Sequence, residues 1–192
     1  KVKLPDVNFK NQSLIVVKNY LYILGGEHST NGVTTNLCYR YDIQDKELET
    51  LNSLNVSRSD ATVENILPKY LSSSSTTSTH RIYLMGGMHQ PHASESETRY
   101  RKVLDSIEVF DCDLGKWQLM KFRLPIPLAR ASCYFSKEND ALFILGGKTK
   151  NRLNLHMWKL DIKTFRGQNL RKLVQPMSDP LTINIQNGYL VI

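Results

Sequence analysis

The hydrophobic residues of this chain gather in short runs, and polar turn residues separate one run from the next. We expect strands at 14–17, 20–24, 37–41, 107–110, 142–145 and 155–160, because these runs are rich in β-branched and aromatic side chains. No segment sustains the apolar period of about 3.6 residues that indicates an amphipathic helix. The pattern therefore predicts an all-β protein.

Three apolar runs end in a pair of glycines, and the three pairs lie at nearly equal spacing along the chain. The pairs are Gly25-Gly26, Gly86-Gly87 and Gly146-Gly147. A repeated unit of this length cannot bury its own apolar face, so it has to stack against its neighbours. At the glycines we expect positive φ or a close approach of another backbone segment. All six glycines are therefore expected to be structural positions of a repeat.

Other features recur when the chain is aligned on the glycine pairs. A basic residue opens the first strand of each repeat: Lys10, Arg58 or Arg130. After each glycine pair a large apolar residue precedes an Asp, in Tyr41-Asp42, Phe110-Asp111 and Leu160-Asp161. A further large residue follows each of these pairs: Leu48, Trp117 and Phe165. The second repeat is longer than the others, and its Ser/Thr-rich segment 67–79 is expected to be a flexible insertion in a hairpin loop.

These features resemble the kelch repeat, in which a glycine pair ends the second strand, an aromatic-Asp pair ends the third and a Trp lies in the fourth. Trp117, followed by the turn at 124–130, is the best copy, whereas Leu48 and Phe165 replace the Trp elsewhere. The resemblance covers the whole chain, 1–192, and implies an all-β, kelch-type β-propeller segment. In such a fold the Trp supplies apolar area between adjacent blades.

The resemblance also implies how the chain divides into four-stranded blades. Three complete blades are expected at about 10–57, 58–129 and 130–177, with partial blades at 1–9 and 178–192. Segment 188–192 matches the strand before a glycine pair and then stops. Because a propeller needs at least about four blades to close, we expect the remaining blades in the same longer chain.

The net charge of +7 is concentrated in one part of the chain. The stretch 148–172 carries eight basic residues against Asp161 alone. It has two interpretations: an outer strand whose lysines protect it from edge pairing, or a face that attracts nucleic acid, anionic lipid or an acidic protein. No run approaches the length of a membrane-spanning helix, so no membrane span is expected.

The cysteines and two glycosylation triplets point to different compartments. Cys38, Cys112 and Cys133 are widely spaced and form no CxxC motif, which favours buried thiols in a reducing compartment, the cytoplasm or the nucleus. Asn11 and Asn55 each begin an Asn-x-Ser triplet, which would indicate secretion, but such triplets often arise by chance.

Motifs for catalysis or for cofactor binding are not found in the sequence. His80, His89 and His92 cluster around the second glycine pair, and two His three apart can ligate a metal. Because Pro91 separates them and no supporting carboxylate is suitably spaced, we expect loop histidines and no metal. There is no nucleophile elbow, phosphate loop or HExxH motif, so neither an enzyme nor a cofactor is expected.

The resemblance implies that partners bind the loops at one end of the propeller, where the second strand joins the third and one blade joins the next. Lys10, Arg58 and Arg130 are expected at equivalent positions around the channel mouth, where arginines can hold carboxylates through bidentate hydrogen bonds. The alternative is that these residues satisfy backbone carbonyls at the blade junctions. Five loop residues complete the expected partner-binding set: His89, Arg99, Arg101, Lys148 and Arg152.

These expectations lead to a function in protein–protein interaction. A kelch module would act as a substrate adaptor of a ubiquitin ligase, or as a signalling or cytoskeletal scaffold, and would bind an acidic segment of its partner. The alternative is a binder of nucleic acid or acidic lipid through the basic stretch 148–172. That alternative lacks the interleaved exposed aromatic residues that stacking on single-stranded nucleic acid requires.

Overall fold

The computed structural model describes residues 8–67, 80–92, 100–164 and 166–180, together with the backbone of 182–185 and 188–191. Most of the expected partial blade 1–9, the insertion 67–79 beyond its first residue, Arg99 and Phe165 lie outside these ranges. The described part of the chain contains strands and turns and no helix. None of it, therefore, is a helix long and apolar enough to cross a membrane.

Three antiparallel four-stranded sheets follow one another along the chain, and in each the strands are neighbours in sequence order. The first sheet contains β2 (Ser13–Val17), β3 (Tyr20–Leu24), β5 (Cys38–Asp42) and β6 (Leu48–Thr50). The second contains β7 (Thr62–Ile66), β8 (Arg81–Met85), β11 (Ser106–Asp111) and β12 (Lys116–Arg123). The third contains β13 (Ser132–Ser136), β14 (Ala141–Leu145), β15 (His156–Asp161) and β16 (Gly167–Lys172).

Each of the six strands expected from the hydrophobic pattern forms, with bounds that differ by at most one residue. The strand expected at 20–24 is β3, and that expected at 107–110 is β11, one residue longer at each end. The all-β prediction is thus confirmed in several antiparallel four-stranded sheets, an arrangement that fits a propeller-like fold. A further antiparallel pair, β17 (Thr182–Ile185) and β18 (Gly188–Val191), follows the third sheet.

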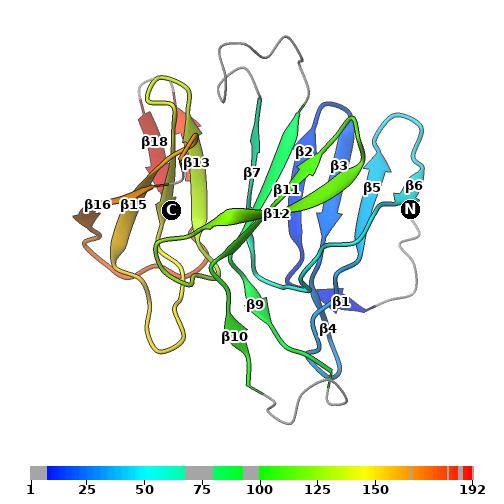
Figure 1. Ribbon diagram of the computed structural model, residues 1–192, viewed down its shortest axis with the longest axis horizontal. Helices are drawn as coiled ribbons and strands as arrows, with labels where there is room; N and C mark the ends of the chain where they lie inside the picture. Colours follow the sequence, from blue (N-terminus) through cyan, green and yellow to red (C-terminus); the bar gives the residue numbers. More distant parts are fainter. Residues whose placement is uncertain are drawn as a thin grey trace.

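The three sheets stand side by side, and their first strands, β2, β7 and β13, contact one another in turn (Figure 1). One apolar cluster lies between the first and second sheets and another between the second and third. Strand β8 contributes to both, because Ile82 and Leu84 face the first cluster whereas Tyr83 and Met85 face the second. The alternating side chains of a strand explain how one sheet is buried on both faces.

One end of the molecule, at the bottom of Figure 1, collects the connections between second and third strands and those between sheets. Two short antiparallel pairs lie there: β1 (Phe9–Lys10) with β4 (Glu27–His28), and β9 (Met88–His89) with β10 (Lys102–Val103). The loop 148–153, between β14 and β15, lies at the same end (Figure 1). We call this region the loop end.

The glycine pairs occur where the chain leaves the second strand of each sheet. The first glycine of the pair has φ of +61°, +64° and +61° in the three sheets. A Cβ on Gly86 would collide with the carbonyl oxygen of Leu128, and one on Gly25 with that of Arg58. These carbonyls belong to the connections that lead to the next sheet. The expected positive φ and close backbone approach are both confirmed.

The aspartates that end each third strand close the turn into the fourth. Asp111 Oδ1 accepts hydrogen bonds from the backbone N–H groups of Asp113 and Leu114, at 3.1 and 3.0 Å. Asp42 and Asp161 cap the equivalent turns in the same way. These backbone hydrogen bonds hold the pKa values of the Asp42 and Asp161 carboxyls below their usual value, because they stabilise the charged form.

Trp117 lies opposite Phe110 in the second sheet and packs against the cluster between the first two sheets. Leu48 occupies the same position in the first sheet, opposite Tyr41, as the sequence alignment expects. In the third sheet the position opposite Leu160 is Gly167 rather than Phe165. That alignment is therefore wrong by two residues. Pro125 occupies the space that a side chain at Gly167 would need, so a Trp cannot fit there.

Candidate functional site

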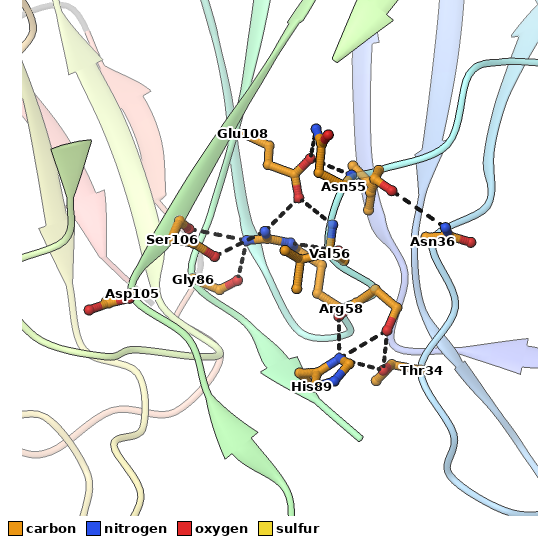
Figure 2. Close-up of polar contacts among 12 residues, drawn as sticks. Thr34, Asn36, Asn55, Val56, Arg58, Gly86, His89, Asp105, Ser106 and Glu108 are labelled. Atoms are coloured by element: carbon orange, nitrogen blue, oxygen red, sulfur yellow. Dashed lines mark hydrogen bonds and ion pairs between the residues drawn. The ribbon is translucent and has the colours of Figure 1, made fainter. Parts of the chain in front are cut away.

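Arg58 lies in the connection from the first sheet to the second, and its side chain points into the interior (Figure 2). The residue is 1% exposed. Its guanidinium donates to the carbonyl oxygens of Gly86 and Ser106, at 2.8 and 3.1 Å, and to Ser106 Oγ at 3.1 Å. It also forms an ion pair with Glu108, with Nη2 2.7 Å from Oε1.

Glu108 completes this buried network from β11. Its carboxylate is 0% exposed and accepts hydrogen bonds from the backbone N–H groups of Asn55 and Val56, at 2.7 and 3.0 Å. Asn55 Nδ2 is a further donor at 2.8 Å. Burial lowers the pKa of Arg58, and the charge of Glu108 opposes that shift. The network fastens the connection at 55–58 to the second sheet.

The placement of Arg58 corrects its expected role in partner binding. A side chain with no exposed guanidinium cannot contact a partner on the surface. The structure shows the alternative interpretation for this residue, an arginine that satisfies backbone carbonyls at the junction of two sheets.

The expected equivalence of Lys10, Arg58 and Arg130 is wrong. The carbonyl of Arg58 accepts the N–H of Gly26 as the carbonyl of Leu128 accepts that of Gly87, so these two carbonyls are equivalent. Lys10 pairs with Glu27, the residue after the first glycine pair, and Ala129 pairs with Lys148, the residue after the third. Lys10 is therefore equivalent to Ala129. The three basic residues thus occupy three successive positions of the repeat. An offset of one or two residues in the alignment of the connections hides this in the sequence.

Arg130 belongs to a different set of equivalent positions, which have φ of +54° to +57° and lie along the inner edges of the sheets: Asn11, Asp60, Arg130 and Asp179. The backbone N–H of each later member donates to the carbonyl of the one before, at 2.9, 2.9 and 3.0 Å. Arg130 Nε also lies 2.9 Å from Asp60 Oδ1. Two neighbouring carboxylates, those of Asp60 and Asp179, offset the charge of Arg130.

At the loop end, the loops of the first and second sheets are bound to each other. Thr34 N–H donates to the Gln90 carbonyl at 3.0 Å, and Gln90 N–H donates to Thr34 Oγ1 at 3.0 Å. His89, which lies beside Thr34 in Figure 2, has its Nδ1 2.9 Å from Ser57 Oγ. This expected partner-binding histidine thus already contacts a neighbouring loop.

Glu27, which is almost fully buried, adds two ion pairs to this junction. Its Oε2 lies 2.8 Å from Arg101 Nη2, and its Oε1 lies 3.6 Å from Lys10 Nζ. Asn11 Nδ2 also donates to Oε1, at 3.1 Å. The junction between the first two sheets is therefore closed by its own side chains.

Between the second and third sheets, by contrast, the loop end is hollowed by a groove of about 690 Å³. Its walls come from β10 with the preceding residues and from the loop between β14 and β15. We call it the basic groove. It is lined by Tyr100, Arg101, Lys102, Val103, Pro127, Thr149, Lys150, Asn151 and Arg152.

The lining of the basic groove is strongly cationic. Four of its nine residues carry a positive charge, and none of the nine carries a carboxylate. Among the described residues, the ion pairs do not involve Lys102, Lys150 or Arg152. Tyr100, at one wall, is 79% exposed. The groove can thus hold an anion between two loops that belong to different sheets.

The groove brings together two residues of the expected set, Arg101 and Arg152. Lys148 is exposed at the base of the same loop, where its backbone pairs with Ala129 and Leu153. Tyr100, Lys102 and Lys150 also line the groove; they lie in loops that are expected to bind partners, but they are not named in the expected set. Their signal was present in the chain, because both loops follow a glycine pair and so emerge at the same end.

The basic stretch 148–172 does not form one continuous surface. Lys148, Lys150 and Arg152 lie at the loop end, whereas the other five basic residues lie on β15, β16 and the turn that joins them. Every residue of β16 is exposed, as expected for a solvated outer strand. The interpretation as a solvated outer strand therefore fits β16, whereas three of the eight basic residues lie at the loop end.

The histidine and cysteine side chains enter ordinary structural contacts. His80 Nδ1 lies within hydrogen-bond distance of the Asn65 side chain. Among the described residues, no group of three His, Cys, Asp or Glu could hold a metal ion. The cysteines form no disulfide, and burial raises the pKa of all three thiols, that of Cys38 to about 12.

One of three comparisons with known proteins finds a similar fold. A scan against protein-family models finds no match, and a search of curated proteins finds no relative. A search of solved structures finds the protein YjhT, with a TM-score of 0.73 and 14% sequence identity. The match covers 97% of this chain and 58% of YjhT, so the chain spans less than two thirds of that protein. At this identity the similarity shows the fold alone.

Proposed function

We propose that this chain is a protein–protein interaction module whose loop end binds an acidic segment of a partner protein in the basic groove. One observation carries the proposal: four cationic side chains line the groove, and none of its described lining residues carries a carboxylate. Arginine suits such a site because its planar guanidinium donates two parallel hydrogen bonds to one carboxylate. The groove also remains open, whereas contacts such as that between Arg101 and Glu27 close the junction between the first two sheets.

We further propose that the sheets belong to a kelch-type β-propeller. The glycine pairs, the capping aspartates and Trp117 support this. So does the outer face of the first sheet, where Leu14 is 56% exposed. The equivalent residues of the next two sheets, Val63 and Cys133, pack against the clusters between sheets. Another sheet of the same protein would cover Leu14 in the same way and continue the ring.

The cellular role in this proposal is that of an adaptor or scaffold. Recruitment of substrates to a ubiquitin ligase comes first and a signalling or cytoskeletal scaffold second, in the cytoplasm or the nucleus. The resemblance to the kelch repeat supports this choice. Binding of nucleic acid or acidic lipid through 148–172 is the competing function, and the division of that stretch between two surfaces makes it the weaker one.

A charge-reversal experiment tests the groove. In the full chain, Lys150→Glu combined with Arg152→Glu should weaken binding of a short poly-glutamate peptide by about tenfold or more, because like charges then face the ligand. Arg171→Glu combined with Lys172→Glu is the matched control, since it makes the same charge change on β16 of the same sheet. Fluorescence anisotropy at low and at physiological salt measures both.

Two outcomes would contradict the proposal. An equal loss of peptide affinity in the groove variant and in the control variant would mean that only the net charge of the protein matters. Tighter binding of a single-stranded oligonucleotide than of the peptide, with a steep dependence on salt and a loss in the β16 variant, would favour the competing function.

A further inference from the structure

We propose that the anion recognised in the basic groove is a phosphate monoester on a phosphorylated segment of the partner, rather than a carboxylate. This inference rests on the proposed function and names the chemistry of its ligand. It concerns what the two walls of the groove can hold together.

Each wall of the groove offers one arginine and one lysine. Arg101 and Lys102 stand on the wall from the second sheet, and Lys150 and Arg152 on the wall from the third. A ligand that satisfies both walls must accept hydrogen bonds from opposite directions. The two oxygens of a carboxylate lie in one plane with a single charge. A phosphate monoester has three terminal oxygens in a tetrahedral arrangement and a charge near −2 at neutral pH.

Both walls are held in place before a ligand arrives. Thr149 N–H and Thr149 Oγ1 donate to the Arg152 carbonyl, at 2.8 and 2.9 Å, so the loop between them is a tight turn that presents Lys150 and Arg152. On the other wall, Lys102 belongs to β10 and pairs with His89 of β9. Because less conformational freedom is lost on binding, such a clamp gains affinity for a ligand that fits it.

The charges around the groove are incompletely neutralised. Glu27 lies beside Arg101, but it also pairs with Lys10, so this one carboxylate faces two cations. Lys102, Lys150 and Arg152 form no ion pair with the described residues. The surplus of positive charge within one short groove matches a compact dianion better than a single carboxylate.

The groove suits a phosphorylated protein segment better than a nucleic acid. Nucleic acids carry one charge per phosphate and are bound along extended basic surfaces with several stacking aromatic residues. Here the cations occupy one groove between two loops, and Tyr100 is the one aromatic residue among the described residues of its lining. Five other basic residues of 148–172 lie away from the groove, on β15, on the edge strand β16 and in the turn between them.

Three peptides that differ only at two positions test the inference on the full chain. The two positions carry phosphoserine in the first peptide, glutamate in the second and serine in the third. We expect the phosphoserine peptide to bind at least about tenfold more tightly than the glutamate peptide at pH 7.5. Lys150→Glu combined with Arg152→Glu should abolish this preference, whereas Arg171→Glu combined with Lys172→Glu should retain it.

The dependence on pH provides a second readout. The second pKa of a phosphate monoester is about 6, so lowering the pH from about 7.5 to about 5.5 should weaken binding of the phosphoserine peptide severalfold. The nine described residues that line the groove include neither histidine nor a carboxylate. Glu27 and Lys10 of the protein lie behind one wall of the groove, and they affect the binding of all three peptides alike. Binding of the glutamate peptide should therefore change little over the same range.

The outcomes separate this inference from the proposed function. The preference for phosphate is overturned if the phosphoserine and glutamate peptides bind with equal affinity and the groove variant binds neither. An acidic segment then remains the proposed ligand. Binding that the groove variant does not affect overturns both proposals. Tighter binding of an oligonucleotide of equal charge overturns the phosphoprotein in favour of nucleic acid.

Discussion

At the scale of single residues, the buried pair of Arg58 and Glu108 occupies positions that the next repeat fills with apolar side chains. The carbonyls of Arg58 and Leu128 each bind the second glycine of a pair. Glu108 pairs with Leu84 as Trp158 pairs with Ile144. Leu128 and Trp158 both belong to the apolar packing between the second and third sheets. The fold therefore does not require charge at these positions, but once one charge is buried the other is needed.

We predict strong energetic coupling between these two residues. Arg58→Met should lower the free energy of unfolding by about 3–5 kcal/mol, because it leaves the Glu108 carboxylate buried without a countercharge. Adding Glu108→Gln should recover part of the loss, because it removes the unpaired buried charge. The recovery is incomplete, since the single amide oxygen can replace only one of the two carboxylate oxygens that accept the N–H groups of Asn55 and Val56. Urea unfolding of the two single variants and the double variant measures the coupling. Strictly additive losses would show that the pair is not coupled.

At the scale of the strand and its connections, the glycine pairs set how closely one sheet approaches the next. Gly86 lies against the Leu128 carbonyl, which is part of the connection from the second sheet to the third. Gly115 also has positive φ, +64°, but it lies in the turn between β11 and β12 with no atom near its missing side chain. The two positions share a left-handed backbone conformation and differ in the space available for a side chain.

This difference gives a matched pair of substitutions. Gly115→Ala should cost about 1–2 kcal/mol, from the left-handed backbone alone. Gly86→Ala should cost about 1–3 kcal/mol more, because its Cβ also forces the Leu128 connection away. Thermal and urea unfolding of both variants would measure the costs. Equal losses would mean that backbone conformation alone, rather than the approach of the next sheet, selects glycine at position 86.

At the scale of the whole molecule, the sheets are joined through shared apolar clusters, so each is stabilised by its neighbours. Strand β8 contributes to the clusters on both of its faces. Cys38 is buried in the cluster between the first and second sheets, and Cys133 packs against the cluster between the second and third. The two thiols thus lie at two different interfaces between sheets.

Thiol labelling can show whether these interfaces open together. Burial raises the pKa of Cys38 to about 12 and also raises that of Cys133, so few thiolates form at pH 8 and alkylation of the native protein should be slow. In increasing urea, both thiols should become reactive at the midpoint of the loss of β-sheet circular dichroism. Mass spectrometry after iodoacetamide treatment assigns the labels. Labelling of Cys133 at distinctly lower urea than Cys38 would show that the sheets unfold separately.

The strands and glycine positions were predictable because they depend on local properties of the chain. The apolar run that forms β3 and the left-handed backbone at Gly86 follow from the residues themselves. The expected site was predicted only in part. Arg101 and Arg152 line the groove, whereas Arg58 is buried and Lys10 is not among the described lining residues. The connections between sheets have no regular period, so their residues could not be aligned from the sequence.

The sequence by itself determined the all-β fold and the repeat, because short apolar runs and the conformational freedom of glycine act over a few residues. Only the tertiary structure decided which basic residues face solvent, since a shift of one or two positions in a connection separates Arg58 from Arg130. It also decided that Arg101 and Arg152, far apart in the chain, share a groove. That proximity depends on how two sheets stack, and stacking is set by the buried clusters as a whole.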